Sequence, residues 1–270
     1  MRIALIITTY NRPDALAAVL EGCVVQTDLN FEVIVADDGS TPVTADLIET
    51  YKVRSPFAIK HVWQDDLGFR AAAIRNRALA ATKAEYIIFV DGDCVFPPGF
   101  VASHRNLAER GWFLSGNRLM LTRSFTEKVL SEKLPIHLWR TGDWLRARWC
   151  GHIERLLPLI HLPALTGLRK RFPLRWKGAK TCNLSAWRAD LLRVNGLDES
   201  YSGWGLEDSD LVIRLLRAGI NNKSARFSVP VFHLWHSEND RSQLIENRQR
   251  LQIVLNASHT RAIQGVDQYL

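Results

Sequence analysis

Two acidic clusters are the residues of this sequence whose types and spacing most directly suggest chemistry. Asp91 and Asp93 are separated by one glycine and directly follow the apolar run 86–90. Glu207 and Asp208 open a segment with helical spacing. Carboxylates are hard oxygen ligands for Mg²⁺ or Mn²⁺ on a nucleotide diphosphate, and an ionised carboxylate at a helix start can act as a general base. Together the clusters predict transfer of an activated group from a nucleotide to a hydroxyl.

Each cluster also has a purely structural interpretation. Most Asp-x-Asp triplets are turns or solvated faces, and acids in the first turn of a helix simply cap it. The position of Asp91 directly after a buried strand favours metal binding. Capping explains Glu207 or Asp208, but it does not explain the flexible aromatic stretch 201–205, which is suited to lining a sugar.

Two histidines near the end of the chain are candidates to complete a metal site. His233 and His236 lie three residues apart at the end of a predicted strand. Imidazole suits Mn²⁺ better than Mg²⁺, although a histidine taken alone is more often structural than a ligand. The pattern leaves both histidines open as ligands and favours His236.

The elements that position these residues alternate between strand and helix. Such alternation indicates a parallel sheet, in which ligands bind beyond the carboxyl ends of the strands. Thr8, Asp38 and Asp91 all fall at such ends and therefore predict one binding edge. The predicted strands are 3–8, 31–36, 58–62, 86–90, 181–186 and 229–234, and the predicted helices are 14–24, 43–51, 69–82, 100–110, 206–216 and 238–255.

Composition is that of an ordinary globular protein with one unusual segment. The chain has 270 residues, 47% of them apolar, and its four widely spaced cysteines favour a reducing, cytoplasmic compartment. No apolar run is long enough to span a membrane. Residues 134–180 depart from the regular pattern, with ten Lys or Arg against two acids and with four tryptophans, which are Trp139, Trp144, Trp149 and Trp176.

The basic segment 134–180 has three interpretations. A nucleic-acid surface is disfavoured, because the chain has no nucleic-acid-binding motif beyond charge. A solvated loop is the simplest alternative. We favour contact with an anionic membrane surface, with Trp at the headgroups and Arg and Lys on phosphates, on the inner face of the cell membrane.

The ordered motifs outside the basic segment resemble the inverting family-two glycosyltransferases of GT-A fold. The match runs through 6–12, 35–40, 68–77 and 87–93, and residues 183–211 look like the C-terminal module of galactosyl- and N-acetylgalactosaminyltransferases. The resemblance implies an α/β, Rossmann-like, mostly parallel sheet with flanking helices and a basic Trp-rich insertion. It also implies a nucleotide-sugar-binding half at 1–118, the insertion at 119–179, and an acceptor-binding and catalytic half at 180–270.

The resemblance further implies roles for individual residues. Asp208 is expected to be the catalytic base, assisted by Glu207 at the acceptor. Asp93, Asp91 and His236 are expected to bind the metal. The residues implied to line the uridine diphosphate or its ribose are Thr8, Tyr10, Arg12, Asp38, Arg75 and Asp91, and those implied to contact sugar are Trp204, Gly205 and Glu207.

The implied activity is a metal-dependent, inverting transfer of a hexose from a UDP-sugar to a saccharide or lipid-linked saccharide, with Mn²⁺ or Mg²⁺ as cofactor. Galactose or N-acetylgalactosamine is the favoured sugar, and cell-surface polysaccharide or lipopolysaccharide is the expected product. A nucleotidyltransferase is the alternative enzyme class, but it would need a Gly-rich, Lys-bearing phosphate loop, which 8–13 lacks. A non-catalytic nucleotide-sugar-binding protein is the third hypothesis, and it is disfavoured because both acidic clusters are intact.

Overall fold

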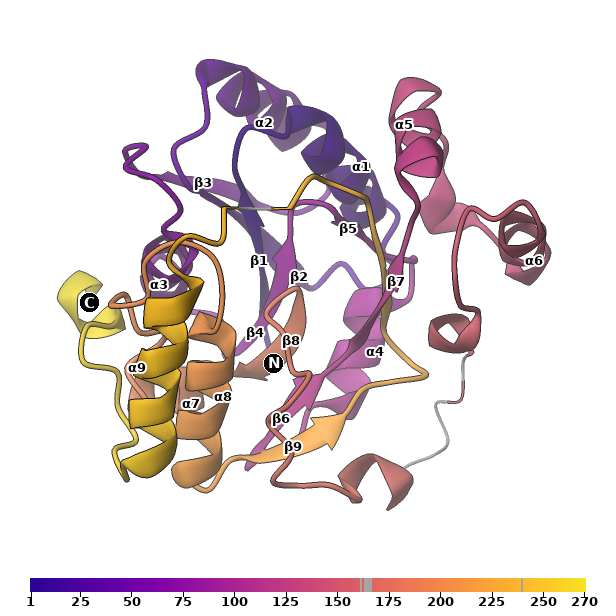
Figure 1. Ribbon diagram of the computed structural model, residues 1–270. Coiled ribbons are helices and arrows are strands. Elements are labelled where there is room, and N and C mark those ends of the chain that lie inside the picture. The colour runs from indigo at the N-terminus through magenta and orange to yellow at the C-terminus, as the bar shows by residue number, and fades with distance from the viewer. Residues whose placement is uncertain (161, 163–166, 239) are drawn as a thin grey trace.

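The computed structural model describes the whole chain except residues 161, 163–166 and 239. Within the described residues the main sheet has seven strands in the order β3-β2-β1-β4-β8-β6-β9 (Figure 1). It is mostly parallel, with β8 antiparallel to both of its neighbours. The strands are β1 (Ile3–Thr9), β2 (Phe31–Asp37), β3 (Ile59–Trp63), β4 (Tyr86–Asp91), β6 (Trp112–Ser115), β8 (Asn183–Trp187) and β9 (Asn221–Ser224).

Helices cover both faces of this sheet. Successive side chains of each strand point to opposite faces, so each strand contributes to two cores. Ile3, Leu5 and Ile7 of β1 belong to a core with helices α1 (Pro13–Val24), α2 (Pro42–Arg54) and α4 (Phe100–Leu107). Ala4 and Ile6 belong to the opposite core, with α3 (Ala71–Ala80), α7 (Arg188–Arg193) and α8 (Glu207–Arg217). Helix α9 (Leu244–Asn256) packs outside α8 through Ile213, Leu251 and Val254. The result is the predicted α/β architecture with helices on both sides of the sheet.

The register of the three parallel strands brings the predicted polar positions to one edge. Thr8 pairs with Asp91 of β4, and Thr9 pairs with Asp37 of β2. The turn after Asp37 requires Gly39, whose φ is +95° and whose Cβ, if present, would lie 2.6 Å from the Asp66 Cα. The polar ends of β1, β2 and β4 therefore form one edge, as the sequence predicts.

A second sheet of three strands lies beside this edge. It consists of β5 (Cys94–Val95), β10 (Pro230–His233) and β7 (Asn117–Met120) in the order β5-β10-β7. His233 pairs with Cys94 on one side and with Met120 on the other. Because Cys94 directly follows Asp93, this pairing brings the C-terminal histidines to the Asp-x-Asp cluster.

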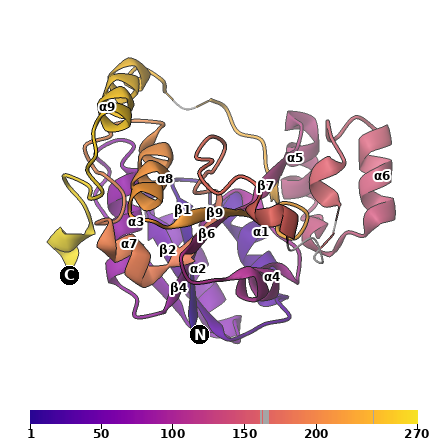
Figure 2. The same cartoon turned by 90° about the horizontal axis from the view of Figure 1, so that it is seen from below.

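The basic Trp-rich insertion packs on the main body of the protein. Its helices are α5 (Arg123–Ser131) and α6 (Thr141–Trp149), which Figures 1 and 2 place at the edge of the molecule away from α9. Trp144 of α6 is buried, with its ring 4.4 Å from Phe232 of β10 and 5.0 Å from Trp139. Trp149 of the same helix is 92% exposed. The tryptophans therefore divide between the core and the surface, and the domain limits at 118 and 180 stay a prediction.

Most predicted elements are present with ends shifted by one to three residues. The predicted helix 238–255 begins only at Leu244, and its residue 239 lies outside the described residues, as do 161 and 163–166 of the basic segment. Strands β5, β6, β7 and β9 and helices α5, α6 and α7 were not predicted. The remaining short elements are the 3₁₀ helices at Ile136–Leu138, Leu157–Leu159, Gly167–Lys170 and Val266–Tyr269.

A search of the described residues finds no helix whose length and hydropathy would let it cross a membrane.

Replacing Trp144 tests whether the insertion belongs to the core. Trp144→Ala removes a buried ring and should lower the free energy of unfolding by about 3–5 kcal/mol. Trp149→Ala in the same helix removes an exposed ring and should change it by less than about 0.5 kcal/mol. Urea denaturation followed by circular dichroism measures both. Equal, small effects would show that α6 does not contribute to the core.

Candidate active site

Arg75 lies at the centre of the predicted site and joins three elements. Its Nε donates to the Thr8 Oγ1 at 3.0 Å, and its two terminal nitrogens donate to the Asp91 Oδ1 at 3.0 Å and the Glu207 Oε1 at 3.1 Å. The guanidinium is buried, which makes these charge-assisted hydrogen bonds strong. One cation on α3 therefore connects the end of β1, the end of β4 and the start of α8.

Glu207 is one of the buried acids at the start of α8. Burial raises the pKa of Glu207, the neighbouring Asp208 raises it further, and Arg75 opposes both effects. A buried carboxylate without a cation would be strongly destabilising. Arg75 is therefore the cation that stabilises the ionised form of Glu207 in this buried position.

Asp93 faces the two C-terminal histidines. The Nε2 atoms of His233 and His236 lie 3.7 and 3.6 Å from different carboxylate oxygens of Asp93. These separations exceed those of ordinary hydrogen bonds. The ligand atoms that cluster here are those of Asp93, Cys94 and His233, whereas His236 faces the other carboxylate oxygen of Asp93. A carboxylate oxygen with imidazole nitrogens is a donor set that suits Mn²⁺.

The tautomer of His236 fits it for metal binding. Its Nδ1 lies 2.6 Å from the Ser237 carbonyl, which can only accept, so Nδ1 carries the proton. Nε2, which faces Asp93, is then the ring nitrogen available to a metal, as in many metal sites in which the other ring nitrogen is hydrogen-bonded. His233 is more buried, and its Nδ1 has no partner among the described residues. Cys94 is also near Asp93, but burial raises its thiol pKa well above the ordinary value, so it is a poor ligand as it stands.

Asp208 lies beside Lys180, a contact that sequence reasoning missed. The Lys180 Nζ is 3.4 Å from the Asp208 Oδ2, and the Asp208 side chain is 8% exposed. Ser209 donates its hydroxyl to the other carboxylate oxygen at 3.3 Å. Lys180 is the last residue of the basic segment 134–180, so its charge was assigned to that segment. Its position just before strand β8, which lies next to β4, was the available signal.

The backbone before α8 is held in a strained turn. Gly203, Gly205 and Leu206 all have positive φ, which is costly for leucine at +79°. Buried Arg214 anchors the following helix, donating to Asp210 at 2.6 Å and to the Val194 carbonyl at 2.6 Å. The helix that carries Glu207 and Asp208 is thus fixed at both its turn and its core face.

The base-binding side of the predicted site is preformed. Asp38 accepts from the Gln64 side chain at 2.5 Å and from the Arg70 backbone N–H at 2.8 Å, and burial raises the pKa of Asp38. Tyr10 donates to Asp66 at 2.8 Å. These contacts place Asp38 and Tyr10 at the same edge.

Two predicted site residues make contacts away from the carboxylates. Arg12 forms its ion pair with Asp14 at 3.5 Å. Trp204 is half-buried and has the Arg241 guanidinium 5.1 Å from the centre of its ring. The structure therefore brings together Thr8, Arg75, Asp91 and Glu207 directly, and leaves the ligand contacts of Arg12 and Trp204 as predictions.

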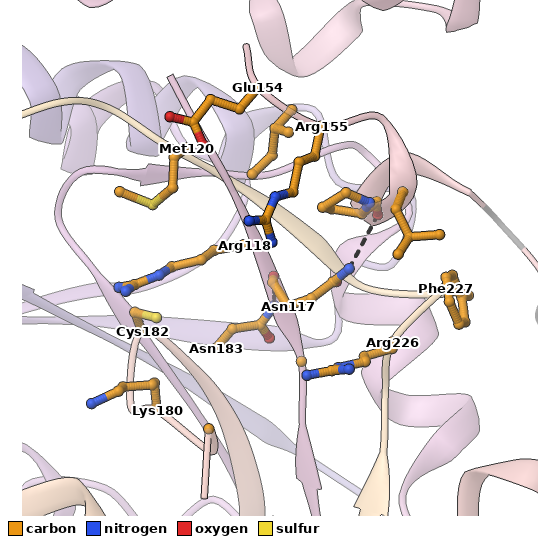
Figure 3. A pocket seen from close by; sticks show the side chains of 15 residues that line it. Asn117, Arg118, Met120, Glu154, Arg155, Lys180, Cys182, Asn183, Arg226 and Phe227 are labelled. Carbon is orange, nitrogen blue, oxygen red and sulfur yellow. Dashed lines mark hydrogen bonds between the residues drawn. The ribbon is translucent and has the colours of Figure 1, made fainter. Parts of the chain in front are cut away.

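A cavity of about 440 Å³ opens beside this site, a size typical of ligand pockets (Figure 3). Its walls include β7, the residues before β8 and residues 154–158 of the insertion. Lys180 and Cys182 belong to its lining, and Lys180 also contacts Asp208. The cavity is therefore adjacent to the proposed base.

Comparison with known proteins defines the class. The model of glycosyl transferase family 2 matches residues 4–150, and that of the N-terminal domain of galactosyltransferase matches residues 165–237. The chain belongs to glycosyl transferase family 2.

The chain is 32% identical over 234 residues to validoxylamine A glucosyltransferase of Streptomyces hygroscopicus subsp. jinggangensis, a match that covers 81% of this chain and 52% of that protein. It is 29% identical over 229 residues to chondroitin synthase of Escherichia coli, a match that covers 80% of this chain and 32% of that protein. The chain thus spans about half or less of these relatives.

Solved structures agree on the fold. TarS of S. aureus in complex with UDP has a TM-score of 0.63 at 14% identity, covering 100% of this chain and 68% of that one. The mannosyltransferase PcManGT from Pyrobaculum calidifontis, in complex with GDP-Man and Mn2+, has a TM-score of 0.61 at 17% identity. That match covers 94% of this chain and 63% of PcManGT. The predicted GT-A fold and the family-two resemblance are confirmed.

Replacing Arg75 should produce a stability loss that depends on pH. Arg75→Gln leaves Asp91 and Glu207 without their cation and should cost about 3–5 kcal/mol at pH 8. The folded-state pKa of Glu207 is already raised above 4.5, and the variant should raise it further. A carboxyl with a raised folded-state pKa destabilises the fold as pH rises through that value, so the deficit should shrink toward pH 4.5.

Chemical denaturation of both proteins between pH 4.5 and 8 measures this deficit. Arg77→Gln, an exposed residue of the same helix, is the matched control and should lose less than about 1 kcal/mol at every pH. A deficit for Arg75→Gln that is constant across this range would contradict the charge network.

Proposed function

We propose that the protein is a metal-dependent inverting glycosyltransferase that moves a hexose from a UDP-sugar to a saccharide hydroxyl. The observation that carries the proposal is the separation of two carboxylate groups around Arg75. Asp93 faces the histidines and Asp91 pairs with Arg75, whereas Asp208 contacts Lys180, which lines the cavity. A metal–diphosphate side and an acceptor side are what a single displacement requires.

In the proposed reaction Asp208 accepts the proton of the acceptor hydroxyl as that oxygen attacks the anomeric carbon. Lys180 and Ser209 orient this carboxylate. The bond to UDP breaks on the opposite face, so an α-linked donor gives a β-linked product. Asp93 and His236, with Asp91, would hold Mn²⁺ or Mg²⁺, which offsets charge on the departing diphosphate. Asp38 and Tyr10 would hold the nucleoside.

The donor and product are inferred from similarity. The match to a galactosyltransferase domain supports galactose or N-acetylgalactosamine, and the glucosyltransferase among the relatives makes glucose the competing sugar. The synthase among the relatives supports polysaccharide synthesis, with lipopolysaccharide or a lipid-linked saccharide as further acceptors.

A donor panel tests the proposal and its rivals. UDP release from UDP-galactose, UDP-N-acetylgalactosamine and UDP-glucose should require Mn²⁺ or Mg²⁺ and should stop with chelator. Asp93→Asn should lower the rate at least about 100-fold at fixed Mn²⁺, because a carboxylate ligand to the metal is lost. Release of diphosphate from a nucleoside triphosphate would instead favour a nucleotidyltransferase, and UDP-sugar binding without release would favour a binding protein.

Asp208→Asn separates catalysis from donor binding. The variant keeps the shape of the side chain but cannot accept a proton, so transfer should fall about 100- to 10,000-fold. UDP affinity, measured by calorimetry, should stay within about twofold. Asp240→Asn, at an exposed position of the C-terminal segment, is the control and should retain full activity. Near-normal turnover by Asp208→Asn would show that another group is the base.

The exposed part of the insertion supports contact with an anionic membrane on the cytoplasmic side. Leu145 and Trp149 are exposed on α6, beside Arg146 and Arg148 of the same helix. Aromatic and basic residues together suit the headgroup region of anionic lipid. All four cysteines are free, which supports a reducing compartment.

Vesicle co-sedimentation tests this contact. The protein should sediment with phosphatidylglycerol vesicles at low salt and not with phosphatidylcholine vesicles. Trp149→Ala should weaken binding several-fold without loss of stability, whereas Leu270→Ala, at the exposed C-terminus, should not. Equal recovery with both lipids, or none with either, would contradict the proposal.

A further inference from the structure

The 440 Å³ cavity beside Asp208 is strongly basic. Arg118, Arg155, Lys180 and Arg226 line it, against one acid, Glu154 (Figure 3). The four cations come from different segments, namely β7, the insertion, the residues before β8 and the turn between β9 and β10. Their convergence on one cavity is therefore a product of the fold and not of one charged run.

The cations of this cavity are largely uncompensated by the protein. Within the part of the chain that the structure describes, the side chains of Arg155 and Arg226 form no ion pair or hydrogen bond to another side chain. Among the same described residues, the one ion pair of Lys180 is with Asp208, at 3.4 Å. Like charges gathered without acids repel each other, and an anionic ligand would remove that repulsion.

The wall that carries Arg226 is fixed by a buried arginine of the insertion. Arg169 donates to the Arg226 carbonyl at 2.8 Å, to the Ser224 carbonyl at 3.1 Å and to the Ser228 hydroxyl at 2.5 Å. Phe227, which also lines the cavity, has a φ of +64°, an unfavourable value for a bulky residue. The insertion thus holds the turn in a conformation that it would not adopt by itself.

Other lining residues of the cavity are also fixed by hydrogen bonds. Asn183 donates to the Asn117 carbonyl at 2.9 Å and to the Val229 carbonyl at 2.6 Å. Gly116 packs so closely there that an added Cβ would lie 2.2 Å from the Asn183 amide. Asn117 in turn donates to the Pro158 carbonyl of the insertion at 3.3 Å. The cavity is therefore a preformed site on rigid elements, which favours binding.

We propose that this cavity binds an acidic group, a carboxylate or phosphate, carried by the saccharide acceptor. The inference rests on the proposed function and names the chemical class of the acceptor. Lys180 both lines the cavity and contacts Asp208, so an acceptor held there has its hydroxyl near the base. Arginine forks on Arg155 and Arg226 give paired hydrogen bonds to carboxylate or phosphate oxygens. Met120, Leu157 and Phe227 supply apolar surface for sugar rings.

The experiment fills the donor site first, so that an added anion reports on the cavity. The protein is saturated with UDP and Mn²⁺ and titrated in a calorimeter at low salt. The probes are p-nitrophenyl β-D-glucuronide, glucose 6-phosphate and neutral p-nitrophenyl β-D-glucoside. At least one acidic probe should bind about tenfold or more tightly than the glucoside, because its charge-assisted hydrogen bonds are added. The tighter acidic probe identifies the group as carboxylate or phosphate.

Variants locate the binding. The double variant Arg155→Gln/Arg226→Gln should bind the acidic probe about tenfold more weakly, which is the affinity expected for the neutral glucoside. Its affinity for UDP should be unchanged. Arg148→Gln, an exposed arginine of the same insertion outside the cavity lining, is the matched control and should leave both unchanged.

Three results would overturn the proposal: equal affinity for acidic and neutral probes, an equal loss in Arg148→Gln, or a loss of UDP affinity in the double variant. Failure of the proposed function shows separately, as absence of UDP release from every UDP-sugar, and does not alter these affinities.

Discussion

The buried guanidinium of Arg75 is the interaction on which the site depends. Thr8, Asp91 and Glu207 come from two strands and a distant helix, and all three bond to this one cation. Without it, the buried Glu207 carboxylate would have no cation, and burial would favour its protonated form. Arg75 thus links the ends of β1 and β4 to the start of α8, the helix that carries Asp208.

Sheet pairing supplies the second constraint. The parallel register aligns Thr8 with Asp91, while the small sheet pairs His233 with Cys94 and so brings both histidines to Asp93. In the proposed function the insertion contributes to the acceptor side, because its buried Arg169 fixes the turn that carries Arg226. We thus propose that the core of the fold provides the donor chemistry and that the insertion provides much of the acceptor recognition.

Apolar periodicity predicted the parallel strands and the polar edge because buried strands leave a strong local signal. It missed β9, whose residues Asn221–Ser224 are all polar and which forms only through pairing with β6. The contact between Lys180 and Asp208 was missed for a related reason, since it joins segments apart in sequence. Trp144 and Trp149 show the limit of composition, because two tryptophans of one helix have opposite burial.

The central claim is a single displacement, with one carboxylate, Asp208, facing the acceptor. The most direct measurement is the anomeric configuration of the sugar first released when the enzyme turns over an α-linked UDP-sugar with water as acceptor, followed by proton NMR before mutarotation. A single displacement predicts the β anomer at early times. Release of the α anomer would show retention and would contradict the assignment of Asp208 as the base of one inverting step.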